Sequence, residues 1–110
     1  MKITIETTKI PNELRKELAA KLDEVEAIRV FAEDEDPTVI AGVAANPNTP
    51  SEILAKLAKD DHLHVLVAVA KNPNTPVETL LELAESKEDY DVIEAVAGNP
   101  NTPAEILSEL

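Results

Sequence analysis

The sequence predicts an all-α repeat protein built from short helices, in units of 26–27 residues. The pentapeptide Asn-Pro-Asn-Thr-Pro occurs three times, at 46–50, 72–76 and 99–103. Between the copies, apolar residues recur with helical spacing. Hydrophobic residues make up 44% of the chain but aromatic residues only 2%, so the core must consist of Leu, Ile, Val and Ala. A fixed period of this length is typical of stacked helical units.

Each pentapeptide is interpreted as the end of one helix and the start of the next. Asn46 can adopt the left-handed conformation that closes a helix, and Pro47 cannot continue one because it lacks an N–H. We expect Thr49 to be an N-cap, Pro50 to take the first helical position and Glu52 to complete a capping box. The same pattern recurs at Thr75–Glu78 and Thr102–Glu105.

The chain divides into an N-terminal arm and a single helical-repeat domain. Residues 1–10 alternate apolar and polar side chains, so Ile3 and Ile5 predict a strand-like or extended arm. No second strand is evident, so the arm either lies over the first helix or pairs with a second copy or a partner's sheet edge. The domain, 11–110, comprises a capping helix at 11–23, repeats at 24–49, 50–75 and 76–102, and a C-terminal capping helix at 103–110.

Apolar spacing predicts the buried face of each helix. In Pro11–Leu22, a stripe is expected from Leu14, Leu18 and Leu22, and this helix resembles the one that begins at Pro50. In the first repeat, Asp36 is expected as an N-cap followed by Pro37. Ile28 and Phe31 lie 26 residues before Leu54 and Leu57, which shows the period of the first repeat. The remaining predicted core is Val39, Ile40, Val43 and Ala44; Ile53, Leu54 and Leu57; Val65, Leu66, Val69 and Ala70; Leu80 and Leu83; Val92, Ile93, Val96 and Ala97.

The net charge of −12 argues against nucleic acid and anionic membrane surfaces as partners, because both attract Lys and Arg. No apolar run approaches the roughly 18 residues of a membrane span, and no secretory signal is evident. We therefore expect a soluble protein, cytoplasmic if it is natural and made in the cytoplasm of an expression host if it is designed.

Positions that vary between repeats provide the candidate protein-contact residues. Positions 37/41, 63/67 and 90/94 are each four residues apart on one helix face, so stacking would align them in a column. These side chains either supplement the core or form an apolar patch where a partner docks. The candidates are Pro37, Ala41, Leu63, Val67, Tyr90 and Glu94, with Leu81 as a similar case on another helix.

No motif predicts a catalytic, cofactor or metal site. Cysteine is absent, the two glycines lie outside any phosphate-binding pattern, and no serine stands in a triad context. His62 and His64 are two residues apart rather than the four that helical metal ligands prefer. The acidic connectors at 33–36, 60–61 and 85–91 are expected to be solvated loops that cap helices, although they could steer a basic partner. We expect no enzymatic activity.

The pattern Asp-Pro-x-Val-x-x-x-Val-Ala-x-Asn-Pro-x-Thr-Pro-x-x-x-Leu, from Asp36 to Leu54, resembles the leucine-rich repeat variant family and the wider HEAT-like helical repeats. The resemblance covers about Glu24 to Leu110. It implies a right-handed superhelix that makes protein contacts and has no intrinsic activity. The units here are slightly longer than the family's, and the cysteines that hold an iron–sulfur cluster in some members are absent, so no cluster is implied.

Two classes of function fit these observations. The three identical pentapeptides, the absence of cysteine and the single methionine suggest a designed or idealised repeat, with a natural acidic repeat protein as the alternative. The first function is a scaffold with a structural or assembly role, including self-association. The second is a protein- or peptide-binding module that uses the variable column or the N-terminal arm.

Overall fold

The computed structural model describes residues 9–86 and 89–108. These residues form eight α-helices and no strand, as the sequence predicts for the repeat domain. The described chain is elongated, with dimensions of 47 × 24 × 18 Å. The helices are α1 (Asn12–Lys21), α2 (Val25–Phe31), α3 (Pro37–Ala45), α4 (Ser51–Leu57), α5 (Leu63–Lys71), α6 (Val77–Ser86), α7 (Tyr90–Gly98) and α8 (Ala104–Leu107).

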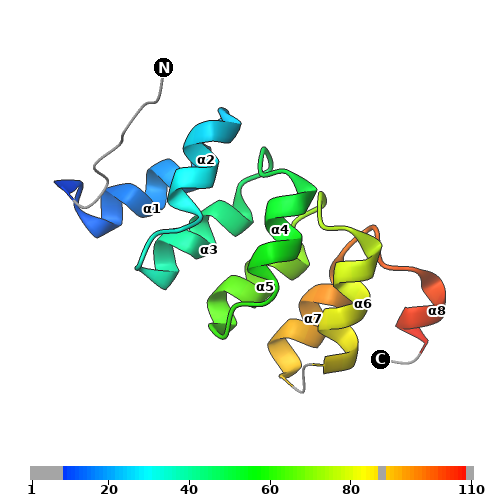
Figure 1. Cartoon of the computed structure of the whole chain (residues 1–110). Coiled ribbons are helices and arrows are strands. Elements are labelled where there is room, and N and C mark those ends of the chain that lie inside the picture. The colour runs from blue at the N-terminus through cyan, green and yellow to red at the C-terminus, as the bar shows by residue number, and fades with distance from the viewer. Residues whose placement is uncertain (1–8, 87–88, 109–110) are drawn as a thin grey trace.

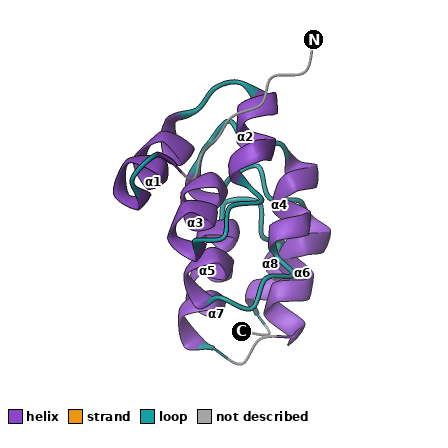
Figure 2. Cartoon of the chain, turned by 60° about the vertical axis from the view of Figure 1, so that its left-hand side comes forward, coloured by secondary structure: helices purple, strands orange, loops and turns teal. Residues whose placement is uncertain are grey.

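The helices are arranged in two layers along the long axis (Figure 1). The first layer is a stack in which α3 packs on α1, α5 on α3 and α7 on α5. The second layer holds α2, α4, α6 and α8, beside the first (Figure 2). One continuous apolar core joins buried side chains from α1 through α7. Because each helix contacts mainly its neighbours in the stack, stability depends on how successive units are joined.

Most of the predicted core is confirmed. The predicted side chains of α4 and α5 are all buried, and so are Leu80 and Leu83 of α6. Ile28 and Phe31 of α2, the counterparts of Leu54 and Leu57, are buried as well. In α3 and α7, Ile40 and Ile93 are half-buried, and Ala97 is exposed although it was predicted to be buried. Ala97 differs from its counterparts in α3 and α5 because no described helix packs on the outer side of α7.

The predicted N-cap of α3 is confirmed. Oδ1 of Asp36 accepts hydrogen bonds from the backbone N–H of Thr38 at 2.9 Å and from its hydroxyl at 2.7 Å. Pro37 takes the first position of the helix. The two hydrogen bonds from Thr38 stabilise the ionised carboxylate and lower the pKa of Asp36 below its usual value.

The threonine of each pentapeptide has a different role from the predicted N-cap. The N-caps of α4 and α8 are Pro50 and Pro103. The hydroxyl of Thr49 instead donates a 2.6 Å hydrogen bond back to the carbonyl of Val43, in the last turn of the preceding helix. Thr75 and Thr102 make the same 2.6 Å bond to the carbonyls of Val69 and Val96. The predicted capping boxes are therefore wrong, because these hydroxyls stabilise the helix that ends rather than the one that begins.

The first asparagine of each pentapeptide also differs from its prediction. Asn46 has φ −73° and ψ 121°, an extended rather than a left-handed conformation, and no described residue has a positive φ. Its side chain is fully buried. Oδ1 of Asn46 accepts a hydrogen bond from the backbone N–H of Asn48 at 2.8 Å, which holds the turn in shape. The predicted left-handed helix end is wrong because the side chain, not a special backbone conformation, organises the turn.

The buried asparagines join each repeat to the one before it. Nδ2 of Asn72 donates to the carbonyls of Ala44 at 2.7 Å and Asn46 at 3.0 Å. Nδ2 of Asn99 donates to the carbonyls of Ala70 at 2.7 Å and Asn72 at 2.9 Å. We call Asn46, Asn72 and Asn99 the asparagine ladder. The last carbonyls of a helix have no hydrogen-bond donor within that helix, and the ladder asparagine of the next unit donates to them.

At the N-terminal end of the stack the ladder stops at a leucine. Nδ2 of Asn46 donates to the carbonyls of Ala19 at 2.8 Å and Leu22 at 2.7 Å, so Leu22 stands where the other units have the asparagine. Leu22 has the same extended backbone, and its side chain packs against the core. No described unit precedes α1, so an asparagine side chain here would find no such carbonyl to bind.

The predicted leucine stripe is wrong at Leu14 and Leu18, whereas Leu22, just after α1, packs against the core as predicted. Leu14 is 47% exposed and Leu18 is 37% exposed, whereas Arg15 and Ala19 are the buried side chains. The reason is that α1 packs on α3 as a first-layer helix, so its buried face is set by the stack. Its start resembles the sequence at the start of α4, but α4 belongs to the second layer.

A buried ion pair fixes α1 to the loop between α2 and α3. Nε of Arg15 lies 3.0 Å from Oδ2 of Asp34, and a guanidinium nitrogen of Arg15 donates to the carbonyl of Ile10 at 2.7 Å. Oδ1 of Asp34 also accepts from the backbone N–H of Asp36 at 2.9 Å. Such a buried charge is tolerated because both partners are hydrogen-bonded. Of the acidic connector residues, Asp34 is thus part of the packed structure rather than a solvated loop.

Two predictions concern the chain termini. The predicted strand with Ile3 and Ile5 falls within residues 1–8, outside the described residues, so it stays a prediction. The predicted C-terminal helix is present as α8 over Ala104–Leu107. None of its residues is fully buried.

The role of the pentapeptide threonine can be tested with Thr75→Asp. Aspartate is a good N-cap, so the capping-box interpretation expects no loss of stability. The observed hydrogen bond predicts a loss of at least about 2 kcal/mol, because a carboxylate would be buried against the carbonyl of Val69. Urea unfolding followed by circular dichroism measures the difference. The control is Ser51→Asp at the exposed first position of α4, which should be near neutral.

The closeness of α1 and α3 can be tested with Gly42→Ala. A Cβ at Gly42 would lie 2.8 Å from the carbonyl oxygen of Lys16 and 3.1 Å from Cβ of Ala19. Overpacking should outweigh the helix-propensity gain of about 1 kcal/mol and lower the free energy of unfolding. Gly98→Ala is the matched control, because a Cβ there meets nothing within 4 Å. A more stable Gly42→Ala protein would show that the two helices can separate without cost.

Candidate protein-contact surface

The outward face of the first layer carries the variable positions of the repeats. The ladder asparagine directly follows α3, α5 and α7, so it sets these helices in the same register. The variable positions 37/41, 63/67 and 90/94 lie nine and five residues before a ladder asparagine. They therefore lie on the same side of the stack, as the sequence predicts for the column. The structure shows which of these side chains come together.

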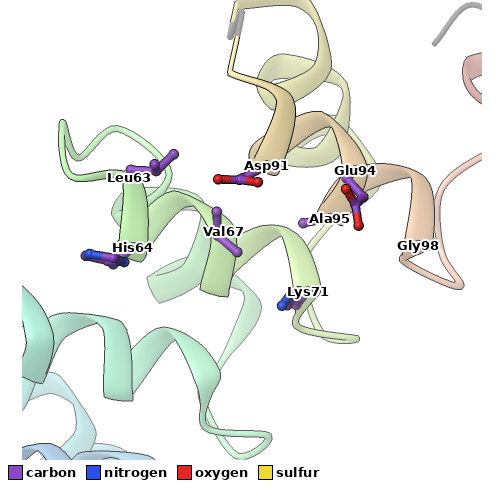
Figure 3. A pocket seen from close by; sticks show the side chains of 8 residues that line it. All are labelled: Leu63, His64, Val67, Lys71, Asp91, Glu94, Ala95 and Gly98. Carbon is purple, nitrogen blue, oxygen red and sulfur yellow. The ribbon is translucent and has the colours of Figure 1, made fainter.

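A hollow of about 460 Å³ lies between α5 and α7 (Figure 3). Leu63 and Val67 of α5 contribute its apolar wall, and Ala95 and Gly98 of α7 lie opposite. Its polar rim consists of His64, Lys71, Asp91 and Glu94. Small residues on α7 leave the space open, because their side chains do not fill the gap between the two helices.

A second hollow of about 400 Å³ lies over α1 and α3. Its floor contains Ala41, Gly42 and Ala45, and its rim carries the charged side chains of α1. A third hollow of about 260 Å³ shares Ala45 and Ala68 with the second. It also shares His64, Val67 and Lys71 with the first. The three hollows lie side by side along one face of the first layer, from α1 to α7, and we call this face the lateral groove.

The predicted contact residues are only partly brought together. Ala41, Leu63, Val67 and Glu94 all line the lateral groove. Leu63 is 37% exposed, which fits the interpretation of the column as a contact patch. Val67 is partly buried against the core, which fits the interpretation that the column supplements the core. The other three candidates lie outside the lining: Pro37 is half-buried in the first turn of α3, Tyr90 is 75% exposed at the start of α7, and half-buried Leu81 belongs to α6 in the second layer.

Several groove residues were missed by the sequence analysis. The positions of Thr38, His64 and Asp91 vary from unit to unit, and so do those of Ala45, Lys71 and Gly98. In each repeat, the first of these positions lies three residues before the position of Ala41, and the second lies four residues after it. All three positions therefore share one helix face. The same variability that singled out the column could have found them. The contribution of α1 could not be predicted, because the sequence at its start resembles that of α4, which belongs to the second layer.

The groove carries opposite charges at its two ends. On α1, Lys16 and Lys21 line it together with Glu17. On α7, Asp91 and Glu94 line it. In a chain of net charge −12, the α1 end is therefore the less acidic part of the groove. A ligand with charges distributed along its length would be oriented by this difference.

The remaining predicted polar residues have local roles. Nδ1 of His62 lies 2.8 Å from Oδ1 of Asp60, and that oxygen also accepts from the backbone N–H of His62 at 2.7 Å. Asp89 caps α7 by accepting from the backbone N–H of Asp91 at 2.8 Å. Within residues 9–86 and 89–108, no three His, Cys, Asp or Glu side chains gather as metal ligands. No helix in the described chain has the length and apolarity to cross a membrane.

Comparison with known proteins finds a family match for one segment of the chain. Residues 63–88 match the family model described as leucine rich repeat variant. The match starts at the first residue of α5 and includes α6. No curated protein and no solved structure matches the chain. The chain is therefore a helical-repeat protein in which residues 63–88 are similar to the leucine rich repeat variant family.

Proposed function

We propose that this protein is a non-enzymatic helical-repeat scaffold with a structural or assembly role. The observation that carries the proposal is the asparagine ladder, in which each buried amide bonds to the backbone of the preceding unit. One apolar core runs beside the ladder through α1 to α7. Together they make the rigidity of each unit depend on its neighbours, which is the property that a scaffold needs.

Two finer features belong to the same proposal. The repeated packing of α1, α3, α5 and α7 and the family resemblance support a right-handed superhelix. The three identical pentapeptides and the absence of cysteine support a designed or idealised origin, with a natural acidic repeat protein as the alternative.

The scaffold proposal predicts that damage in the middle of the ladder affects the whole chain. Asn72→Ala removes two donated hydrogen bonds and leaves the carbonyl of buried Ala44 without a donor, which should lower the free energy of unfolding by about 3 kcal/mol. The control Asn74→Ala removes exposed hydrogen bonds of the same kind and should cost about 1 kcal/mol.

Two probes measure whether this loss is shared. Far-ultraviolet circular dichroism reports all helices, and the fluorescence of Tyr90, the single tyrosine, reports α7. We expect coincident urea transitions in the wild type and in Asn72→Ala. Transitions that separate would mean that the units unfold independently, which contradicts a cooperative scaffold.

A protein- or peptide-binding module is the second candidate function, and the lateral groove favours it. The groove joins exposed apolar side chains to a charged rim, which is the composition of a protein-contact surface. Pairing through the arm with Ile3 and Ile5 remains a prediction of the sequence. We do not expect nucleic acid or membranes as partners.

The groove can be tested with peptides selected from a displayed random 12-residue library against the wild-type protein. Leu63→Glu places a charge in the groove, whereas Val77→Glu places one outside it. The two residues are matched, because each is the first residue of its helix and they are 37% and 39% exposed. Selected peptides should lose at least about tenfold in affinity, or about 1.4 kcal/mol, with Leu63→Glu only. Equal affinities for both variants would rule the groove out as their binding site.

A further inference from the structure

The surface that joins one first-layer helix to the next is left open on α7. Ala44 of α3 and Ala70 of α5 are fully buried, and a ladder asparagine from the next unit binds the carbonyl of each. The equivalent residue of α7, Ala97, is exposed. The half-buried Ile93 lies one turn before it on the same helix. The outer side of α7 therefore repeats a surface that is covered twice elsewhere in the molecule.

The complementary surface is open on α1. The ladder register places Leu18 of α1 at the position of Gly42 in α3, and Gly42 faces the preceding helix, close to Lys16 and Ala19. In α1 this side faces no described helix, and Leu14 and Leu18 are exposed there. The two open sides thus correspond in position to the two sides that meet inside the stack, with the larger Leu18 on α1 where α3 has Gly42.

The second layer shows the same incompleteness. α8 lies in line with α4 and α6 (Figure 2), and its Leu107 is equivalent to Leu54 and Leu80. Leu54 and Leu80 are fully buried, but Leu107 is 44% exposed, because no described first-layer helix follows α8. α1 is in turn a first-layer helix without a described second-layer helix before it. An α8 and an α1 placed side by side would complete one two-helix unit.

Charge disfavours contact between two α7 ends. Residues 89–108 contain four carboxylates and no lysine or arginine. On α1, Arg15 is paired with Asp34, and the exposed charges are those of Lys16, Lys21 and two glutamates, so this end is neutral on balance. Contact between two α7 ends would bring carboxylates together, whereas contact between α7 and α1 pairs an acidic end with one that carries two exposed lysines.

We propose that copies of this protein stack head to tail, with α1 of one copy docked on α7 and beside α8 of the next. The proposal rests on the scaffold function and specifies how the scaffold assembles. Because Leu22 replaces the ladder asparagine, the joint between copies has apolar contacts but no buried amide bond. The joint is therefore weaker than those within the chain, and assembly is reversible. A head-to-tail joint of this kind is heterologous, so it extends into open chains of copies.

Two single substitutions test the polarity of the joint. Leu18→Glu blocks the α1 side and leaves α7 intact, and Ala97→Glu blocks the α7 side and leaves α1 intact. Both positions are exposed, so neither substitution removes a packed core side chain. Val77→Glu adds the same charge at a side chain that is 39% exposed in the second layer and serves as the control. Sedimentation equilibrium of the full chain over a range of concentrations measures the mass.

We expect the mass of the wild type and of Val77→Glu to rise with concentration beyond that of a dimer. Each blocked variant alone should remain a monomer, and an equal mixture of the two should form a dimer and nothing larger. That dimer would also show that both variants are folded. Dimers of Leu18→Glu alone would indicate contact between α7 ends and overturn the proposal.

Two other results would also overturn the head-to-tail joint. A wild type that stays monomeric at all concentrations would overturn the joint. The scaffold function would still hold in that case if the helices of the wild type unfold in coincident transitions. Association that appears only when residues 1–8 are deleted would assign the α1 side to that segment instead.

Discussion

The structure depends on a buried carboxamide that bonds to the backbone of another repeat. Each ladder asparagine donates both of its N–H groups to carbonyls at the end of a helix in the preceding unit. Its oxygen accepts the backbone N–H two residues later. The carboxamide is thus satisfied on every side, which makes its burial tolerable. An aspartate would place a negative oxygen against two carbonyls, and a leucine would leave the carbonyl within the helix, such as that of Ala44, without a donor.

This arrangement explains why the whole pentapeptide is repeated. A short helix ends with unpaired carbonyls, and helices of seven to ten residues have little stability of their own. The threonine hydroxyl satisfies one carbonyl from within the unit, and the asparagine of the next unit satisfies others. The pentapeptide therefore supplies hydrogen-bond donors to the carbonyls at helix ends. Its threonine acts on the helix just before it, and its asparagine acts on the preceding unit.

The two ends of the stack show what happens where a neighbour is absent from the described chain. At α1, Leu22 replaces the asparagine and Arg15 forms a buried ion pair with Asp34, so that this helix is held by other means. At α7, the inter-repeat surface is unchanged and remains exposed at Ala97. The difference gives the molecule a polarity along its axis, which the charge of its last residues increases.

The sequence by itself determined the helical class, the period, most of the core and the Asp36 cap, because apolar spacing and strong helix breakers act locally. It also located half of the groove, through variable positions such as Leu63 and Val67. Only the tertiary structure decided the roles of Asn72 and Thr75, since their partners are carbonyls that no sequence pattern marks. It likewise decided that Leu14 and Leu18 are exposed, because the buried face of α1 is set by the helix that packs on it, not by its own periodicity.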